Sequence, residues 1–252
     1  MKYGIAQGIR PATIGQIKDI GATLIQAIPP GLTFETASWI LGHKSKLQAH
    51  TQEFFLNSMS RVDPVRQWQS FYQKAFGLKV GLSYVEIPER TEEQKKEFTR
   101  LVVILKCLTN NQVYDACAKH FPCSRYTEDL DSGVPTSERD PKNGTYAIWV
   151  RDVVEADEVH KKNSANMIKG LGIKTETLLE RMLHGLKYFL ETGRHLDITN
   201  CTLCSGSRYS DGGVPDGYWD GGEFGVRWGD ADSGGLRSRE VVSCLIPRDL
   251  FR

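Results

Sequence analysis

The segment at residues 205–235 limits the possible folds more than any other part of the sequence. It reads SGSRYSDGGVPDGYWDGGEFGVRWGDADSGG and contains ten of the chain's 24 glycines, together with five aspartates. Phe224, Val226 and Trp228 alternate with other residues, as in a β-strand that buries one face. Asp220-Gly221-Gly222 precedes them and is typical of a hairpin turn. We therefore predict a hairpin with a fixed apolar framework, which consists of Val214, Trp219, Phe224, Val226, Trp228 and Leu236.

On composition alone, the same segment would suit a flexible linker or a glycine-rich surface loop. Tryptophans and β-branched residues at strand spacing do not belong in a linker, and a strand candidate at residues 237–242 follows directly. The residues between the apolar ones are mainly Tyr, Asp, Ser, Gly and Arg. This set is similar to that of an antibody paratope, where Tyr supplies rigid contact area and small polar residues supply adaptable hydrogen bonds. The pattern favours a binding surface.

The C-terminal part of the chain resembles the variable proteins of diversity-generating retroelements, in their bacterial versions. Four segments carry the resemblance: YAIWVR at 146–151, LCSGSR at 203–208, VP at 214–215 and LRSREVVS at 236–243. One departure is Ser205-Gly206-Ser207-Arg208, which stands where better-known members have Gly-Gly-Ser-Trp. The resemblance does not extend to the N-terminal residues.

In that family a reverse transcriptase copies a template with errors at adenines and rewrites the end of the target gene. Asparagine codons then become codons for residues such as Asp, Gly, Ser, Tyr, Arg and Ala, but never Lys, Gln, Glu, Met or Trp. Residues 205–235 contain no Lys, Gln or Met, and Trp219, Glu223 and Trp228 are the exceptions to the rule. Two of these three already belong to the predicted framework.

The resemblance implies an α+β fold of the C-type-lectin-like kind, in which variable side chains stand on short strands and loops over an invariant core. It implies a protein that binds a protein or another surface ligand, with no enzymatic activity, no cofactor and no metal ion. The ligand-binding positions that it implies are Tyr209, Gly213, Asp216, Tyr218, Asp220, Gly225, Arg227, Gly229, Asp230, Asp232, Ser233, Gly234 and Gly235. Among them, Tyr209, Tyr218 and Arg227 are of types common in binding hot spots.

The rest of the chain predicts a helical support or interaction region at residues 1–88 and an α+β domain at residues 89–252. Apolar residues recur at helical spacing in the first part, for example Ile14, Ile17 and Leu24. Pro88 and a charged run at 89–97 separate the two parts. In the second part, residues 101–105 and 146–150 are predicted strands, and a helix follows Thr177.

A second hypothesis is an α+β enzyme or a zinc-binding domain. Cys201 and Cys204 have the spacing of a zinc knuckle, and Cys117, His120 and Cys123 offer further ligands, but a second CxxC pair is missing. Buried free thiols are the simpler interpretation. Asp230 and Asp232 resemble the start of a calcium loop without its later ligands, and the acidic stretch around His160 is interpreted as a solvated face.

Charge and hydropathy exclude other classes of protein. A net charge of +1 argues against a dedicated nucleic-acid-binding protein. No apolar run approaches the roughly 20 residues that a membrane-spanning helix needs, so no membrane insertion is expected. Residues 1–12 lack the layout of a signal peptide, which favours a cytoplasmic location. Homo-oligomerisation through the N-terminal helices stays open.

Overall fold

The computed structural model describes residues 12–62 and 64–244. Most of residues 1–12, where the sequence predicts no signal peptide, lie outside this description. The chain divides into two compact units, with the boundary along the sequence between Gln67 and Trp68. Each unit is described by itself. Within the described residues, no helix is long and apolar enough to cross a membrane.

The N-terminal unit contains α1 (Ile14–Gln26), α2 (Phe34–Gly42) and α3 (Lys44–Val62), followed by the start of α4 (Pro64–Phe76). Thr13 begins α1 with a capping box, in which its hydroxyl accepts from the Gln16 amide and the Gln16 side chain accepts from the Thr13 amide. The predicted helical character is confirmed. No residue of α1 or α2 is buried, and Ile14, Phe34 and Trp39 are 74%, 81% and 59% exposed.

The sequence predicts a division after residue 88, but the structure divides the chain after Gln67. Helix α4 explains the difference. Its apolar stripe, with Trp68 and Tyr72 at 1% and 0% exposure, is buried in the C-terminal unit. The indole of Trp68 donates to the Leu101 carbonyl at 2.9 Å, and the hydroxyl of Tyr72 donates to the Val103 carbonyl at 2.7 Å. Most of the helix therefore belongs to the second unit.

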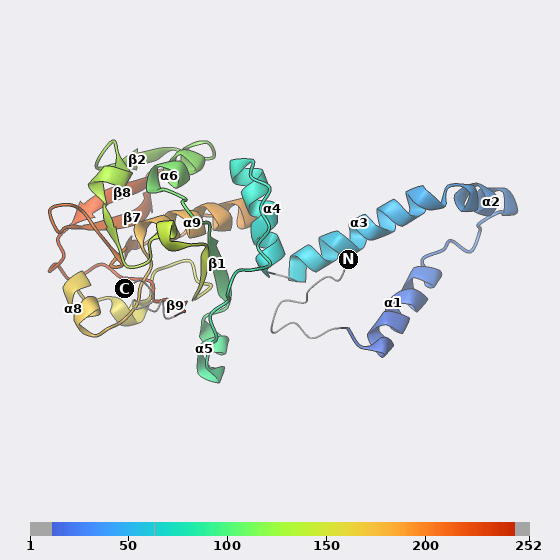
Figure 1. The fold of residues 1–252 in the computed structure, drawn as a ribbon, viewed down its shortest axis with the longest axis horizontal. Helices are drawn as coiled ribbons and strands as arrows, with labels where there is room; N and C mark the ends of the chain where they lie inside the picture. Colours follow the sequence, from blue (N-terminus) through green and yellow to red (C-terminus); the bar gives the residue numbers. More distant parts are fainter. Residues whose placement is uncertain (1–11, 63, 245–252) are drawn as a thin grey trace. The chain divides into compact units, whose positions relative to one another are not determined.

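The C-terminal unit is a mixed α+β domain with small sheets, as predicted (Figure 1). One sheet has the order β1-β4-β9 and is antiparallel; the second has the order β2-β8-β7-β5, with β2 parallel to β8; the third pairs β3 with β6. The strands are β1 (Arg100–Ile104), β2 (Cys123–Arg125), β3 (Thr136–Ser137), β4 (Tyr146–Val150), β5 (Cys201–Leu203), β6 (Ser207–Arg208), β7 (Val214–Asp220), β8 (Glu223–Gly229) and β9 (Val242–Ser243).

Helices cover these sheets. They are α5 (Glu92–Glu97), α6 (Asn110–Ala118), α7 (Leu130–Gly133), α8 (Ala165–Gly170) and α9 (Leu178–Thr192), with short 3-10 turns η1 (Pro141–Asn143) and η2 (Glu158–His160). The central helix α9 contacts both β1 and β7, so it lies between the two larger sheets (Figure 1). It begins with a capping box at Thr177 and Glu180, and it ends at Gly193, whose φ of 69° suits glycine.

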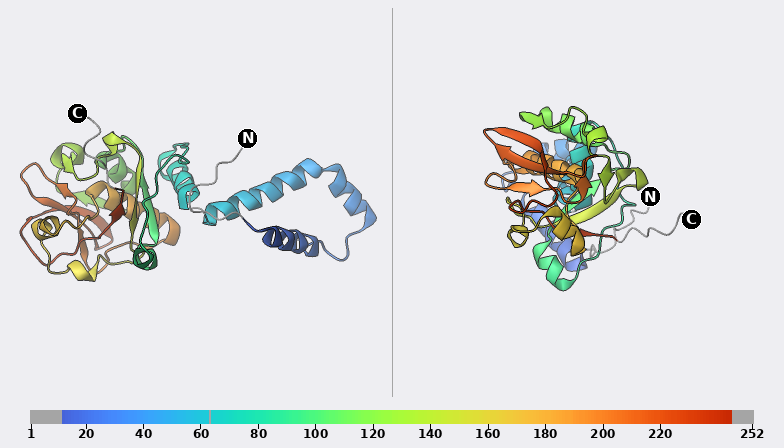
Figure 2. Two further views of the ribbon diagram at one scale, coloured as in Figure 1. Left: turned by 60° about the horizontal axis from the view of Figure 1, so that its bottom comes forward. Right: turned by 90° about the vertical axis from the view of Figure 1, so that its left-hand side faces the viewer.

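The predicted hairpin is present: β7 and β8 pair antiparallel along their whole length and form the orange-red strand pair of Figure 2. Gly221 and Gly222 make the turn with φ values of +60° and +86°, which fits the glycine requirement of a type I′ turn. The strand predicted at 237–242 is largely wrong. That segment makes isolated bridges from Arg237 to Thr202 and from Glu240 to Thr175, and regular pairing begins only at Val242.

A buried ionic cluster joins three segments of the C-terminal unit. Asp197 is fully buried and accepts from the guanidinium groups of Arg181 and Arg239, each at 2.7 Å, and from the Thr202 hydroxyl at 2.5 Å. Burial alone would raise the pKa of Asp197, but the two arginines lower it below its ordinary value. Because α9, β5 and residue 239 all converge here, the carboxylate connects three segments that are distant in sequence. Gly217 of β7 lies against Arg181 from the same cluster.

Candidate ligand-binding surface

The register of the hairpin places the predicted ligand-binding positions of β7 and β8 on one face. Asp216 lies opposite Arg227, and Tyr218 lies opposite Gly225. Since alternate residues of a strand point to opposite sides, a single face carries all such positions of the two strands. We call this face the outer face of the hairpin; besides Val214 and Glu223, it carries Asp216, Tyr218, Asp220, Gly225, Arg227 and Gly229.

The other face of the hairpin packs into the domain core. Phe224 and Val226 are 5% and 1% exposed, and the Arg181 guanidinium lies 5.5 Å from the centre of the Phe224 ring. Trp219 is partly exposed, while Trp228 is 39% exposed and donates its indole N–H to Asp211. The buried role predicted for Phe224 and Val226 is confirmed, and that predicted for Trp228 is wrong. Val214 is buried as well, but on the outer face, where it packs with Ala165 and Leu203. Trp228 is in phase with the core residues but lies near the end of the strand, where the core no longer covers it.

Three side chains of the outer face form one connected group. The Arg227 guanidinium stacks over the Tyr218 ring, with 3.8 Å from Cζ to the ring centre. Its Nε and Nη2 atoms donate to Oδ1 of Asp216 at 3.1 and 3.0 Å. Nη2 also lies 3.0 Å from the sulfur of Cys201 on the neighbouring strand β5. The group therefore presents a planar cation and an aromatic ring in a fixed arrangement, which suits contact with a protein surface.

Two members of the outer face are buried beneath these side chains. Asp216 is 3% exposed, because Arg227 lies over it. Burial raises the pKa of the Asp216 carboxyl, and Arg227 offsets only part of that rise. At Gly225, an added Cβ would lie 2.1 Å from the Tyr218 ring, so the ring takes the space that a side chain would need. Asp216 and Gly225 therefore influence the surface through Arg227 and Tyr218, which lie over them.

Tyr209 and Gly213 lie away from the exposed surface. Tyr209 is 5% exposed, and its hydroxyl donates to the Arg227 carbonyl at 3.3 Å. Gly213 is buried under Trp228, because a Cβ at this position would be 2.0 Å from the indole nitrogen. With Asp216 and Gly225, the structure therefore buries four of the thirteen positions at which the sequence predicts ligand contacts. Short-range spacing could not show that β6 and β8 enclose this loop.

The remaining predicted positions form an exposed loop after β8. All five are exposed: Asp230, Asp232, Ser233, Gly234 and Gly235. Asp232 accepts from the Asn166 amide at 2.7 Å, which ties the loop to α8. Asp230 accepts from the backbone N–H of Asp232 at 2.9 Å, so its carboxylate serves the turn itself. Together, the outer face and this loop gather eleven of the thirteen predicted positions.

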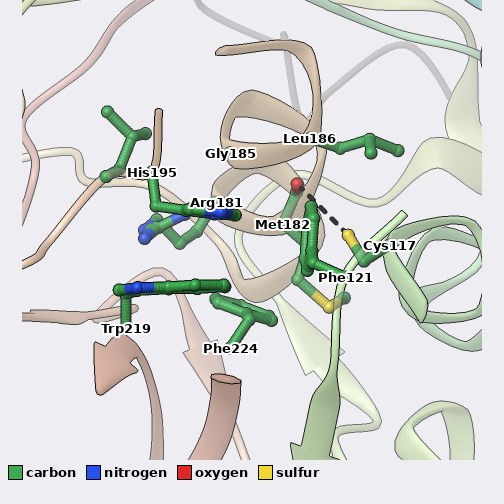
Figure 3. A pocket seen from close by; sticks show the side chains of 10 residues that line it. Cys117, Phe121, Arg181, Met182, Gly185, Leu186, His195, Trp219 and Phe224 are labelled. Carbon is green, nitrogen blue, oxygen red and sulfur yellow. Dashed lines mark hydrogen bonds between the residues drawn. The ribbon is translucent and has the colours of Figure 1, made fainter. Parts of the chain in front are cut away.

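A nearly filled pocket lies under the opposite face of the hairpin (Figure 3). Its free volume is about 10 Å³, and it is lined by residues that include Phe121, Arg181, His195, Trp219 and Phe224. His195 stacks on Trp219 with ring centres 3.3 Å apart and planes within 8°. Burial, with a smaller contribution from Arg181, lowers the pKa of His195 to about 4. The neutral imidazole therefore supports the edge of the hairpin as an uncharged ring.

The proposed zinc ligands are not brought together. Cys201 pairs with Tyr218 and Cys123 pairs with Phe224, so they lie on opposite faces of the sheet. Cys117 and Cys204 are buried, with thiols donating to the carbonyls of Met182 and Thr202, and burial raises the pKa of both. Among the described residues, the cysteines and His120 are in no cluster suited to a metal ion, and the same is true of the Asp230–Asp232 stretch.

A different cluster was missed by sequence reasoning. His160 and Asp157, interpreted above as part of a solvated face, are 3% and 5% exposed, and they lie beside Glu240 from a distant segment. The i, i+3 spacing of Asp157 and His160 was the available sign, but the acidic residues around them concealed it. The importance of Arg239, which is 1% exposed and binds Asp197, was also missed.

Searches of protein-family models, curated proteins and solved structures found no match to this chain.

Proposed function

We propose that this chain is a ligand-binding protein, a variable protein of a diversity-generating retroelement, with a C-type-lectin-like C-terminal domain. The outer face of the hairpin and the loop at 230–235 contact a protein or another surface ligand. Diversification of these positions changes the ligand. The chain acts by binding, without catalysis and without a cofactor.

One observation carries this proposal. The six predicted variable positions within β7 and β8 fall on a single face, which they share with Val214 and Glu223, whereas Phe224 and Val226 fall on the other. Four of the six, Tyr218, Asp220, Arg227 and Gly229, are exposed or partly exposed, so substitution there is less costly than in the core. The separation is what a protein needs if its ligand contacts are to change while its fold is kept.

The chemistry of the exposed residues supports a macromolecular ligand. Tyr218 and Arg227 supply the aromatic and guanidinium groups that dominate many protein interfaces. Asp220, Asp230 and Asp232 are exposed and add negative charge on either side of them. The mixed α+β domain with small sheets also fits the proposed fold class.

The decisive experiment is sequencing of the DNA around the gene. We expect a nearby repeat that differs from codons 205–235 only at adenine positions of the template, together with a reverse transcriptase gene. The differences should fall on codons of the outer face and the loop. Codons for Phe224 and Val226 serve as the internal control and should be identical. Absence of such a repeat, or differences spread equally over the control codons, would refute the proposal.

A further inference from the structure

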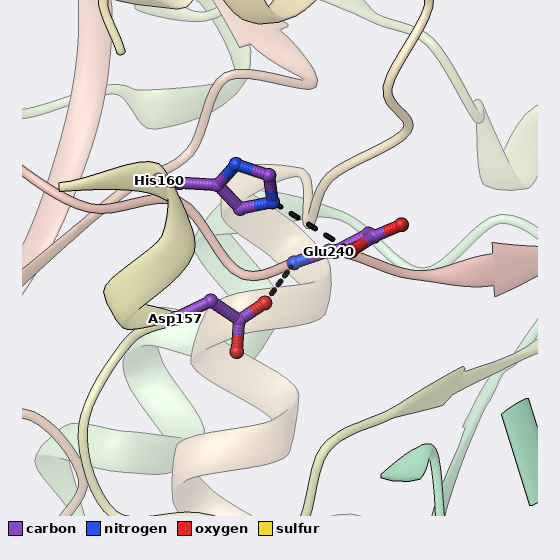
Figure 4. Close-up of side chains that lie close together, drawn as sticks. All are labelled: Asp157, His160 and Glu240. Carbon is purple, nitrogen blue, oxygen red and sulfur yellow. Dashed lines mark hydrogen bonds and ion pairs between the residues drawn. The ribbon is translucent and has the colours of Figure 1, made fainter. Parts of the chain in front are cut away.

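Asp157, His160 and Glu240 form a compact group outside the proposed ligand-binding surface. Asp157 precedes the 3-10 turn η2, His160 ends it, and Glu240 comes from the segment before β9. One carboxylate oxygen from each acid and one ring nitrogen of His160 lie within 4.8 Å of one another (Figure 4). The backbone N–H of Glu240 donates to Asp157 at 2.7 Å, which fixes the two segments together.

The ring of His160 is buried, and one of its nitrogens has no hydrogen-bond partner. Nε2 points towards Glu240 Oε2, at a distance of 3.6 Å that is too long for a hydrogen bond. A buried polar atom without a partner is energetically costly, so it calls for an explanation. The Asn163 amide lies 3.5 Å from Nδ1. With its oxygen turned to Nδ1, this amide would accept a hydrogen bond from Nδ1–H and leave the Nε2 lone pair facing the carboxylates.

The surroundings of the group attract cations. A groove of about 800 Å³ opens beside it, and its lining includes the carboxylates Glu97, Glu155 and Glu158 as well as Asp157 and Glu240. Two arginines, Arg151 and Arg237, also line the groove. With five carboxylates against two guanidinium groups, the lining carries a net negative charge. A small cation can reach the group, since the Glu240 side chain is 33% exposed.

Arg151 bridges the two carboxylates of the group. Its Nη1 lies 2.7 Å from Asp157 Oδ2 and 3.2 Å from Glu240 Oε2. The guanidinium therefore holds both acids in place and balances part of their charge. The Glu240 oxygen that it contacts, Oε2, is also the oxygen that faces His160 Nε2, so a bound cation would share this carboxylate with Arg151. Arg151 would compete electrostatically with such a cation and lower its affinity.

We propose that Asp157, His160 and Glu240 form a binding site for a divalent transition-metal ion. Two carboxylates and one imidazole make a mixed oxygen and nitrogen ligand set, which suits ions such as Mn²⁺. Water would complete the coordination from the groove. The site contains no residue of the outer face of the hairpin, so metal binding can be tested separately from the proposed function.

The test is a Mn²⁺ titration of the full chain, followed by electron paramagnetic resonance. Mn²⁺ is the better probe because zinc would also bind the chain's six cysteines. We expect one bound ion per chain. Pulsed measurement on the wild-type protein should show coupling of the ion to a histidine nitrogen, and this coupling should change when histidine is labelled with ¹⁵N. Absence of Mn²⁺ binding, or binding without nitrogen coupling, would overturn the proposal.

Variants provide the second arm of the experiment. His160→Gln and Glu240→Gln should each weaken Mn²⁺ binding by at least about tenfold. His120→Gln, which changes an exposed histidine outside the group, should bind as the wild type does. Arg151→Met keeps most of the side-chain stem and should bind Mn²⁺ more tightly, because the competing charge is gone. Unchanged binding in the first two variants would place the ion elsewhere and overturn the proposal.

Discussion

Asp216 and Arg227 are predicted to depend on each other, although both belong to the proposed variable surface. The side chain of Asp216 is 4% exposed, whereas that of Arg227 is 47% exposed. Arg227→Met removes both hydrogen bonds to the buried carboxylate and leaves it without its partner. Hydrogen bonds to charged groups contribute about 1.5–3 kcal/mol, and the half-exposed arginine places this pair towards the lower end. We expect a loss of about 2 kcal/mol in the free energy of unfolding.

A double-mutant cycle measures the dependence by urea unfolding. Asp216→Asn alone should cost about 1 kcal/mol, since the freed guanidinium can reach water. The double variant should cost about 2 kcal/mol, less than the sum of the single losses, which gives a coupling energy of about 1 kcal/mol. Asp220→Asn serves as the matched control, because it changes an exposed carboxylate on the same face of β7. Its combination with Arg227→Met should be additive, and additivity of the Asp216 cycle as well would refute the reasoning.

The pH dependence gives an independent check with a defined sign. Burial raises the pKa of Asp216 above its ordinary value of 3.8, so the folded state binds this proton more tightly than the unfolded state. Protonation of Asp216 therefore favours folding, and its charged form disfavours it. Without Arg227 the pKa should rise further. The deficit of Arg227→Met relative to wild type should shrink as the pH falls through the raised pKa towards 3.8. A deficit that grows on acidification would contradict this account.

Three further predictions follow from the packing. Val226→Ala should cost about 2 kcal/mol in urea unfolding and Trp228→Ala only about 1 kcal/mol, because Val226 is 1% and Trp228 is 39% exposed; the reverse order would be inconsistent with the observed faces. The imidazole resonances of His195 should titrate near pH 4 in NMR spectra. The stability from its neutral ring should be fully present above pH 6.5 and be lost progressively as the pH falls from 6.5 to about 4; titration near 6.5 would contradict the burial of the ring. Ile17, 59% exposed on α1, should contribute to homo-oligomerisation: light scattering should show concentration-dependent association that Ile17→Glu abolishes, and a monomeric wild type would exclude it.

The hairpin could be predicted from sequence because its signals are local. A period of two in Phe224, Val226 and Trp228 determines which side chains share a face, and the Gly221-Gly222 pair sets the turn. The extent of burial along that face could not be predicted, because it depends on what other segments cover. Phe224 meets Phe121 and Arg181, whereas Trp228 has Asp211 and Gly213 beside it near the strand end. The same periodicity therefore gave one correct and one wrong assignment.

The Asp157–His160–Glu240 group is a site that could not be predicted from the sequence. Two of its members are three residues apart, but the third is supplied by a segment 80 positions after His160. The sequence predicted a regular strand for that segment, which would have said nothing about the direction of Glu240. In the structure, Arg239 points into the Asp197 cluster and Glu240 faces Arg151. Irregular backbone between two isolated bridges allows both contacts, and such backbone has no periodic signature.

The glycines of the hairpin show that the proposed variable positions do not act independently. A side chain at position 225 would displace the Tyr218 ring, on which the Arg227 guanidinium stacks. Movement of Arg227 would in turn uncover Asp216 and remove the cation that partly offsets the burial of its charge. A substitution at one outer-face position is therefore expected to change both the shape and the charge of its neighbours. Diversification of few codons would then produce larger changes in the binding surface than the number of substitutions suggests, while Phe224 and Val226 keep the fold unchanged on the opposite face.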